Sequence, residues 1–198
     1  RADDWRAAAA RGHELGNHSI FHPATRRKAW VTEGIALENY TLDRMRHELR
    51  VASRVLHMLD GRTERTYAFP CGNPVLGRIG WTKTLLYALG QEHTRLPGWV
   101  DRLGVDWGSR ERDFTCIIRE LFYAARIGGA SMPWPALAPL DRHRIPSIQC
   151  DGLAPDTACQ IVDRAIEAGA WAVLTFHDLG NDRSLSCSVE TLTAICNR

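Results

Sequence analysis

Two histidines near the start of the chain have the residue type and the spacing of a metal site. His18 and His22 are four residues apart within the segment Gly12–Pro23. On a helical turn, their imidazoles would therefore lie on the same side. Neutral imidazole nitrogens are ligands that zinc and similar divalent ions prefer. A histidine pair at this spacing is also common by chance, so one ring packed in the core and the other on the surface is the alternative interpretation.

A third histidine follows an apolar run. His177 comes directly after Ala170–Phe176 and directly before Asp178. The run suits a buried parallel strand, which would place His177 at the carboxyl end of that strand. Histidine at such a position can act as a general acid or base. A hydrogen-bonded histidine with no catalytic role is the alternative.

Alternating helices and strands must position these residues. Thr41–Leu59 is the clearest helix, with apolar side chains at helical spacing on one face and Gly61 as the stop. Further helices are expected at 5–11, 79–90, 156–168 and 189–196, and strands at 66–69, 121–127, 145–150 and 170–176. Residues 91–113 read as an irregular excursion and 128–139 as a loop. The pattern predicts an α/β fold with parallel strands. His18, Pro70, Asp151 and His177 each follow a predicted strand, where α/β barrels build their sites.

Composition excludes several classes of protein. The chain has 198 residues and a formal net charge of +2, from 25 basic and 23 acidic residues spread along it. One domain is expected at this length, and the charge pattern argues against a nucleic-acid surface. The longest run of small or apolar residues is Ala7–Ala10, so no membrane span is expected. No signal peptide is visible, and the six cysteines include no C-x-x-C pair, which argues against a zinc ribbon.

Three stretches resemble one enzyme family. Gly12–Pro23 resembles the H-[ST]-x-x-H motif of the polysaccharide deacetylases, also known as the NodB-homology or carbohydrate esterase family 4 domain. Thr66–Gly72 resembles that family's aromatic-proline-tyrosine-glycine turn, with Cys71 in place of the tyrosine. Val173–Asp178 resembles its apolar strand ending in His-Asp.

The resemblance implies a fold, an activity and a set of roles. The fold would be a distorted (β/α) barrel forming a single domain over residues 1–198. The activity would be metal-dependent removal of N- or O-acetyl groups from a carbohydrate polymer, with a divalent metal such as zinc as the cofactor. His18 and His22 would be metal ligands, and His177 the acid that protonates the leaving group. Phe69, Pro70, Cys71 and Gly72 would line the groove, with the Cys71 backbone N–H binding the oxyanion. The family implies a secreted or cell-envelope location.

Two candidates compete for the family's fourth motif, an Asp that is normally followed by Trp. Asp106-Trp107 matches by letters but precedes a predicted strand and lies in the irregular excursion. Asp151 ends the strand 145–150, one helix before His177, where the family places this Asp. We therefore expect Asp151 to hold the second ring nitrogen of His177, with Gly152 in the tryptophan's place. Asp-Gly also marks ordinary turns, so a simple turn is the alternative for Asp151.

One family motif has no counterpart in the sequence. The family's first strand ends in Asp-Asp, which supplies a general base and a metal ligand, whereas Asp3-Asp4 stands before a predicted helix and is expected to be its N-cap. A catalytically inert or carbohydrate-binding relic is therefore the alternative function. A different metal hydrolase using Asp178 as an acidic ligand is a weaker third possibility. Trp81 and Trp134 are expected to pack in the core and loops rather than stack on sugars.

Overall fold

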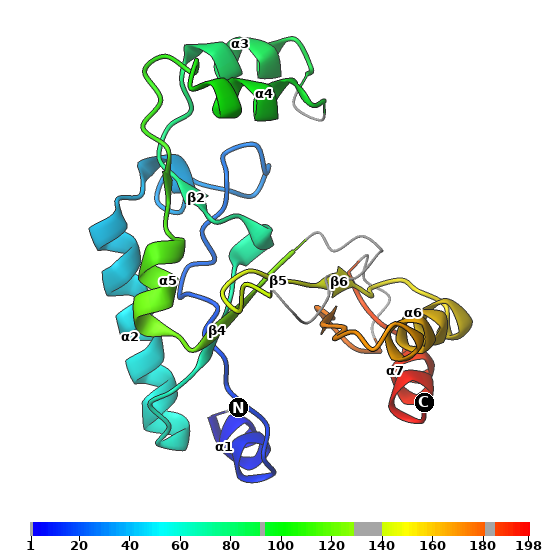
Figure 1. Cartoon of the computed structure of the whole chain (residues 1–198). Helices are drawn as coiled ribbons and strands as arrows, with labels where there is room; N and C mark the ends of the chain where they lie inside the picture. The colour runs from blue at the N-terminus through cyan, green and yellow to red at the C-terminus, as the bar shows by residue number, and fades with distance from the viewer. Residues whose placement is uncertain (1, 92–93, 129–139, 181–184) are drawn as a thin grey trace.

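The computed structural model describes residues 2–91, 94–128, 140–180 and 185–198, and its strands form a largely parallel array (Figure 1). The first sheet has the order β1 (Thr66–Ala68), β4 (Ala124–Ile127), β5 (Ile145–Pro146), with parallel neighbours. After β5, the single residue Ser147 leads to β6 (Ile148–Gln149), which pairs in parallel with β7 (Leu174–Thr175). A parallel bridge from Asn17 to Tyr67 adds the segment before His18 to the other edge of β1. Neighbours in space thus follow the order of the chain, as in an α/β fold.

Helices connect these strands. They are α1 (Ala2–Ala10), α2 (Leu42–Asp60), α3 (Trp81–Ala88), α4 (Leu96–Leu103), α5 (Thr115–Leu121), α6 (Pro155–Glu167) and α7 (Val189–Cys196). Short 3₁₀ turns, η1 (Leu37–Asn39) and η2 (Pro70–Gly72), and the antiparallel pair β2 (Val75–Leu76) and β3 (Arg112–Asp113), complete the described elements. Figure 1 shows α2 and α5 side by side, the α3–α4 pair at one end, and α6 packed on α7 beyond β6.

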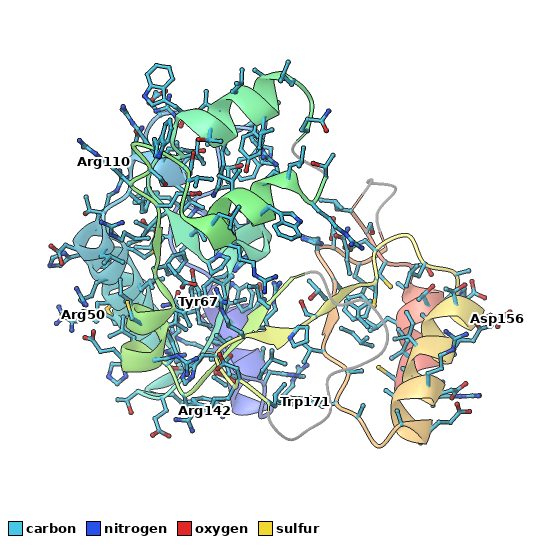
Figure 2. The ribbon with its side chains drawn as sticks, turned by 45° about the horizontal axis from the view of Figure 1, so that its top comes forward. Arg50, Tyr67, Arg110, Arg142, Asp156 and Trp171 are labelled. Atoms are coloured by element: carbon cyan, nitrogen blue, oxygen red, sulfur yellow. The ribbon has the colours of Figure 1, made fainter. Side chains whose placement is uncertain are left out.

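The core lies between the first sheet and the helices α2 and α5. Met45 and Leu49 of α2 pack with Ile117 and Ile118 of α5 and with Tyr67 of β1, all almost completely buried. Figure 2 places Tyr67 in the interior, while Arg50 and Asp156 lie on the outside. Since side chains alternate along a strand, Tyr67 and its register partner Ala125 face this core, and Ala68 and Arg126 face the opposite side. That opposite side carries the candidate site.

Several expected elements are found. The α/β class and the parallel strands are confirmed. Helix α2 begins after Thr41, whose side chain accepts a hydrogen bond from the Arg44 N–H, and ends at Gly61 in the left-handed region. Within the described residues, no pairing between β7 and the segment at Asn17 closes the sheet, so a closed barrel is not shown.

Other expectations were wrong. The excursion at 91–113 contains α4: its Pro97 lies in the first helical turn and its Gly104 is the left-handed C-cap, so residues taken as breakers are the helix's start and stop signals. The strand expected at 121–127 begins only at Ala124, because Phe114, Ile117, Ile118 and Leu121 are spaced for one face of a helix, α5. The run 170–176 is not a buried strand. Only Leu174 and Thr175 are paired, and Trp171 (Figure 2) is half exposed.

The acidic pair near the start also differs from expectation. Asp3 and Asp4 lie inside the first turn of α1 rather than before it, and Asp3 forms an exposed ion pair with Arg6.

Among the described residues, no helix combines the length and apolarity needed to cross a bilayer. All six cysteines are free thiols.

Candidate active site

The three histidines gather at one cavity, of about 780 Å³, which we call the site cavity. His18, His22 and His177 line it together with Cys71 and Gly72. The rest of the described wall comes from strands and from loops. The strand residues are Arg126, Gln149 and Thr175, and the others are Lys28, Trp30, Gly128, Ser147 and Leu185. The candidates from the two halves of the sequence thus meet in one place.

His18 and His22 lie close together, although not on a helix. Their ring centroids are 4.9 Å apart with the planes nearly perpendicular. No helical turn is present, because residues 18–22, which we call the histidine loop, turn through two left-handed residues, Ser19 with φ 66° and His22 with φ 50°. The rings nevertheless face the same cavity.

Two buried polar side chains hold the histidine loop. The Asn17 amide donates to the Leu49 carbonyl and the Ser53 hydroxyl at 2.9 Å each, and its own oxygen accepts from the Ser19 N–H at 2.8 Å. Oε1 of Glu48 accepts the Ile20 and Phe21 N–H groups at 3.2 and 3.1 Å.

Glu48 is itself fixed, because the Tyr40 hydroxyl donates to its second oxygen at 2.8 Å. The sequence analysis overlooked both Asn17 and Glu48. For Glu48 the available signal was a carboxylate directly before Leu49 on the apolar face of the helix expected at 41–59.

Hydrogen bonding and burial prepare both imidazoles to act as neutral ligands. His18 Nδ1 is 2.7 Å from the Ala68 carbonyl. Because a carbonyl oxygen can only accept, this nitrogen carries the proton and Nε2 keeps its lone pair. Burial lowers the pKa of His18, although the Ala68 bond opposes this, and His22, Arg126 and His177 lower it further. Burial likewise lowers the pKa of His22, with His177 and Arg126 contributing.

The donor set for a metal is only partly present. The two neutral imidazoles fit a zinc-type ion by ligand type and closeness. Among the described residues, however, no group of three or more histidine, cysteine, aspartate or glutamate side chains is arranged to hold an ion. A catalytic zinc site normally has three protein ligands, so the described residues supply two of them.

Asp151 and His177 form a hydrogen-bonded pair. The Asp151 carboxylate accepts from His177 Nδ1 at 2.6 Å and from the His177 backbone N–H at 3.0 Å. The Asp151 side chain is 1% exposed, whereas that of His177 is 47% exposed. Burial raises the pKa of the Asp151 carboxyl, but the two hydrogen bonds and the charge of His177 outweigh this and hold the pKa below its ordinary value. The carboxylate therefore keeps the proton on Nδ1 and leaves Nε2 as the free ring nitrogen.

Only half of the expected groove turn reaches the site cavity. Phe69 and Pro70 are buried, and Phe69 packs against Tyr67 and Phe114 in the core, so neither lines the cavity. Cys71 lines it in the left-handed region with φ 50°, and among the described residues its backbone N–H has no hydrogen-bond acceptor. Gly72 must be glycine, because a Cβ there would lie 2.7 Å from the Gly128 nitrogen. The free N–H of Cys71 suits an oxyanion donor.

Asp106 has a structural role far from His177. Its carboxylate accepts from the Gly80 N–H at 2.6 Å and the Lys83 N–H at 3.0 Å, which satisfies the first turn of α3 from outside the helix. The Trp107 carbonyl accepts from the Trp81 N–H at 2.9 Å. Asp106, which matches the family motif by its letters, thus caps a helix. Asp151 is the carboxylate that is hydrogen-bonded to His177.

The remaining candidates lie elsewhere. The Asp178 carboxylate accepts from the Leu179 N–H at 2.8 Å and does not line the site cavity. Trp81 is 79% exposed at the start of α3, so the expectation that it packs in the core was wrong. Trp134 falls outside the described residues. Sequence reasoning missed Trp30, which lines the cavity with its ring centroid 5.5 Å from that of His22. No spacing rule links Trp30 to the histidines, because a loop brings it back.

Comparison with known proteins supports the resemblance read from the motifs. Residues 1–91 match the family model described as polysaccharide deacetylase. This range contains His18, His22 and the turn at 69–72, and it ends before Asp151 and His177. No curated protein and no solved structure is significantly similar to the chain. The resemblance is thus confirmed for residues 1–91, which match the family model described as polysaccharide deacetylase.

Proposed function

We propose that this protein hydrolyses N- or O-acetyl groups on carbohydrate. The observation that carries the proposal is the placement of the Asp151–His177 pair on the same cavity as His18 and His22. These residues come from opposite halves of the sequence. The family match over residues 1–91 supports the same activity. We further infer that the parallel array is part of a distorted (β/α) barrel and that residues 1–198 act as one domain.

His177 acts as the general acid in this proposal. Asp151 holds Nδ1 protonated, so a second proton on Nε2 can be donated to the departing sugar amine or alkoxide. The Cys71 N–H donates to the oxygen of the acyl carbonyl as negative charge develops on it. Trp30 offers an aromatic face to the sugar beside His22.

A divalent ion would be held by His18 and His22. When bound, such an ion lowers the pKa of a coordinated water and polarises a carbonyl. The His18–Ala68 hydrogen bond orients the first imidazole for this task, as outer-shell partners of metal ligands generally do. Among the described residues, no third ligand joins the two imidazoles, and no carboxylate that could serve as the base lines the site cavity.

That incomplete donor set favours a second candidate function. A protein with two imidazoles and no base near them could bind acetylated carbohydrate without hydrolysing it. The site cavity, the aromatic side chain of Trp30 and the polar residues of the strands would suit the binding of a carbohydrate equally well. The two functions differ only in whether bonds are broken.

Acetate release from acetylated chito-oligosaccharide and acetylated xylan, measured with and without zinc, tests the proposal. The unmodified protein is compared with His177→Asn and with His47→Asn as the control. The His47 ring lies on the exposed face of α2, where it is hydrogen-bonded to the Asp43 carbonyl. We expect release that requires His177 and not His47. Binding of these substrates without release, or release unaffected by His177→Asn, would exclude the proposed hydrolysis by this site.

A further inference from the structure

The site cavity is lined by cations without carboxylates. Among the described residues, its charged and titratable lining consists of Lys28, Arg126, Cys71 and the three histidines, and no aspartate or glutamate lines it. The Asp151 side chain is buried, and its carboxylate accepts a hydrogen bond from the His177 ring. A ligand entering the cavity therefore meets positive charge.

Arg126 is the most confined of these cations. It follows Ala125 on β4, and the alternation of the strand directs Arg126 away from the core, next to the small side chain of Ala68. Among the described residues, its guanidinium has no hydrogen-bond or ion-pair partner. Burial lowers the pKa of Arg126, yet a guanidinium stays protonated. Holding a partly buried cation without a counterion costs free energy, which an anionic ligand would offset.

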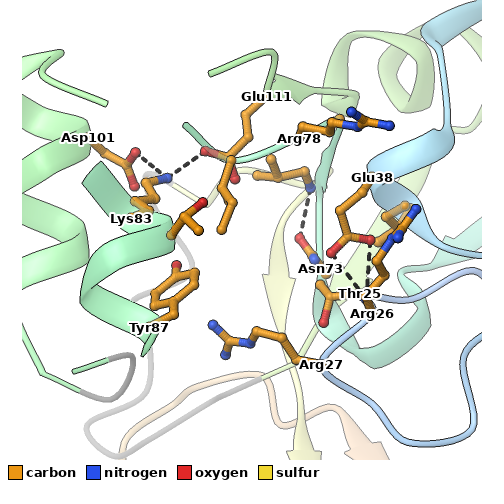
Figure 3. Close-up of a pocket in the computed structure, with 15 residues that line it drawn as sticks. Thr25, Arg26, Arg27, Glu38, Asn73, Arg78, Lys83, Tyr87, Asp101 and Glu111 are labelled. Atoms are coloured by element: carbon orange, nitrogen blue, oxygen red, sulfur yellow. Dashed lines mark hydrogen bonds and ion pairs between the residues drawn. The ribbon is translucent and has the colours of Figure 1, made fainter. Parts of the chain in front are cut away.

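A neighbouring cavity shows that this arrangement is not general for the protein. The second cavity, of about 790 Å³, is lined by residues of α3 and of the loop before η1 (Figure 3). There the Lys83 ammonium pairs with Asp101 and Glu111, and the Arg26 backbone and side chain are bound by Glu38 and Glu33. The second cavity is thus lined by three carboxylates, Glu38, Asp101 and Glu111, whereas no aspartate or glutamate among the described residues lines the site cavity.

The floor of the site cavity is polar but uncharged. Gln149 of β6 and Thr175 of β7, which are register partners, line it together with Ser147, the residue between β5 and β6. The Thr175 hydroxyl is buried without a hydrogen-bond partner among the described residues. Hydroxyl-rich ligands can satisfy such groups, so the floor suits a sugar while Arg126 suits an acid.

We propose that the carbohydrate bound in the site cavity carries a carboxylate next to its acetylated sugar, and that Arg126 binds this carboxylate while Lys28 attracts it at the rim. The inference rests on the proposed function, since it names the substrate class of the same site. The planar guanidinium matches a carboxylate with two parallel N–H···O bonds. Neutral acetylated polymers would leave Arg126 without a counterion.

The test compares oligosaccharides that differ in charge alone. A hyaluronan tetrasaccharide and an O-acetylated oligogalacturonate are each compared with their methyl esters, which keep the sugars and remove the charge. Binding to the unmodified protein is measured by calorimetry, and acetate release is measured by a coupled assay. We expect the acids to bind on the order of 10- to 100-fold more tightly than the esters, as for a hydrogen bond to a charged group.

Variants assign the effect to Arg126. Arg126→Gln should remove the preference for the acid, and Arg126→Lys should retain part of it. Arg27→Gln removes the same charge from the second cavity, where the guanidinium lies 4.6 Å from the Tyr87 ring centroid, and should leave the preference intact. Thermal unfolding verifies that each variant is folded. Because the acid–ester comparison uses the unmodified protein, a poorly folded variant does not decide the matter.

The outcomes separate this inference from the proposed function. Preferential, Arg126-dependent binding of the acids without any acetate release supports the acidic ligand and contradicts hydrolysis. Acetate release at equal rates from acids and esters, with equal binding, supports hydrolysis and overturns the acidic substrate. Equal loss of release from acid and ester in Arg126→Gln would place Arg126 at the reacting acyl group and also overturns the inference, as would the absence of binding by all four compounds.

Discussion

The carboxylate of Asp151 accepts hydrogen bonds from both the ring and the backbone of His177, although 26 residues separate them. The backbone bond fixes where His177 leaves β7, and the ring bond fixes its tautomer. Asp106, the other candidate carboxylate, makes the same two-oxygen contact with the first turn of α3. Two aspartates with similar local bonding thus have separable roles.

Exchange of each aspartate for asparagine should separate these roles. Asp151→Asn should lower kcat for acetate release by about 10²- to 10⁴-fold, because the ring loses its fixed tautomer. Asp106→Asn should leave kcat unchanged and lower the free energy of unfolding by about 1 kcal/mol, because the amide keeps one acceptor oxygen for two backbone N–H groups and one hydrogen bond is lost. Steady-state kinetics and urea unfolding of both variants provide the measurement. A kcat effect confined to Asp106→Asn would reverse the assignment.

Zinc binding should reflect the two-imidazole donor set. We expect weak binding of zinc by this chain, because two ligands leave the ion mostly hydrated, and loss of that binding in either His18→Ala or His22→Ala. His57→Ala, on the exposed end of α2, should have no effect. Calorimetric titration measures all four proteins. Tight binding that survives His22→Ala would show that these imidazoles are not the ligands.

The pH dependence of zinc binding has a defined sign. Burial lowers the pKa of both imidazoles below the ordinary 6.5, so each takes up its proton at a lower pH than an exposed histidine does. The affinity for zinc should therefore fall as the solution is acidified, where protons compete for Nε2, and its decline should lie below pH 6.5. Histidine resonances followed by NMR would show the two midpoints directly. Midpoints above 6.5 would contradict the effect of burial.

The sequence predicted the site where local signals and strand order agree. A histidine pair, an apolar run before His177 and an aspartate at the end of the preceding strand suffice to place residues at one edge of a parallel sheet. The left-handed path of the loop at His18 could not be predicted, because the hydrogen bonds of Asn17 and Glu48 determine it. Trp30 and Arg126 could not be predicted, since a returning loop and the side of β4 that faces the cavity decide their positions.

Glu48 should control the histidine loop. Glu48→Ala leaves two loop N–H groups and the Tyr40 hydroxyl without their acceptor, which should cost about 1–3 kcal/mol of unfolding free energy and weaken zinc binding. Glu48→Gln keeps a carbonyl oxygen and should retain most of both. Glu120→Ala, which removes partly exposed ion pairs to Arg46 and Arg50, should cost less than about 1 kcal/mol and leave zinc binding unchanged. Equal effects of the Glu48 and Glu120 changes would exclude a specific role in the loop.

The buried ion pair between Asp60 and Arg65 should dominate the acid sensitivity of the fold. Both side chains are 1% exposed, and Arg65 also donates to the Leu15 carbonyl at 2.7 Å, just before Asn17. Hydrogen bonding from Arg65, against the opposing effect of burial, lowers the pKa of Asp60 to about 2. A lowered pKa means that the unfolded chain takes up the proton first, so this contribution is complete above about pH 4 and lost as pH falls toward 2. Asp60→Asn should therefore lower the unfolding free energy at pH 7 by about 3–5 kcal/mol, since it leaves the guanidinium buried without its charge partner. The difference in unfolding free energy from the unmodified protein should narrow below pH 4.

Asp43→Asn is the control, because the Asp43 carboxylate is 83% exposed in its pair with Arg46. This change should alter the unfolding free energy little at any pH. Urea unfolding between pH 3 and 7 measures the three proteins, and parallel pH profiles for Asp60→Asn and the unmodified protein would show that another group governs acid unfolding.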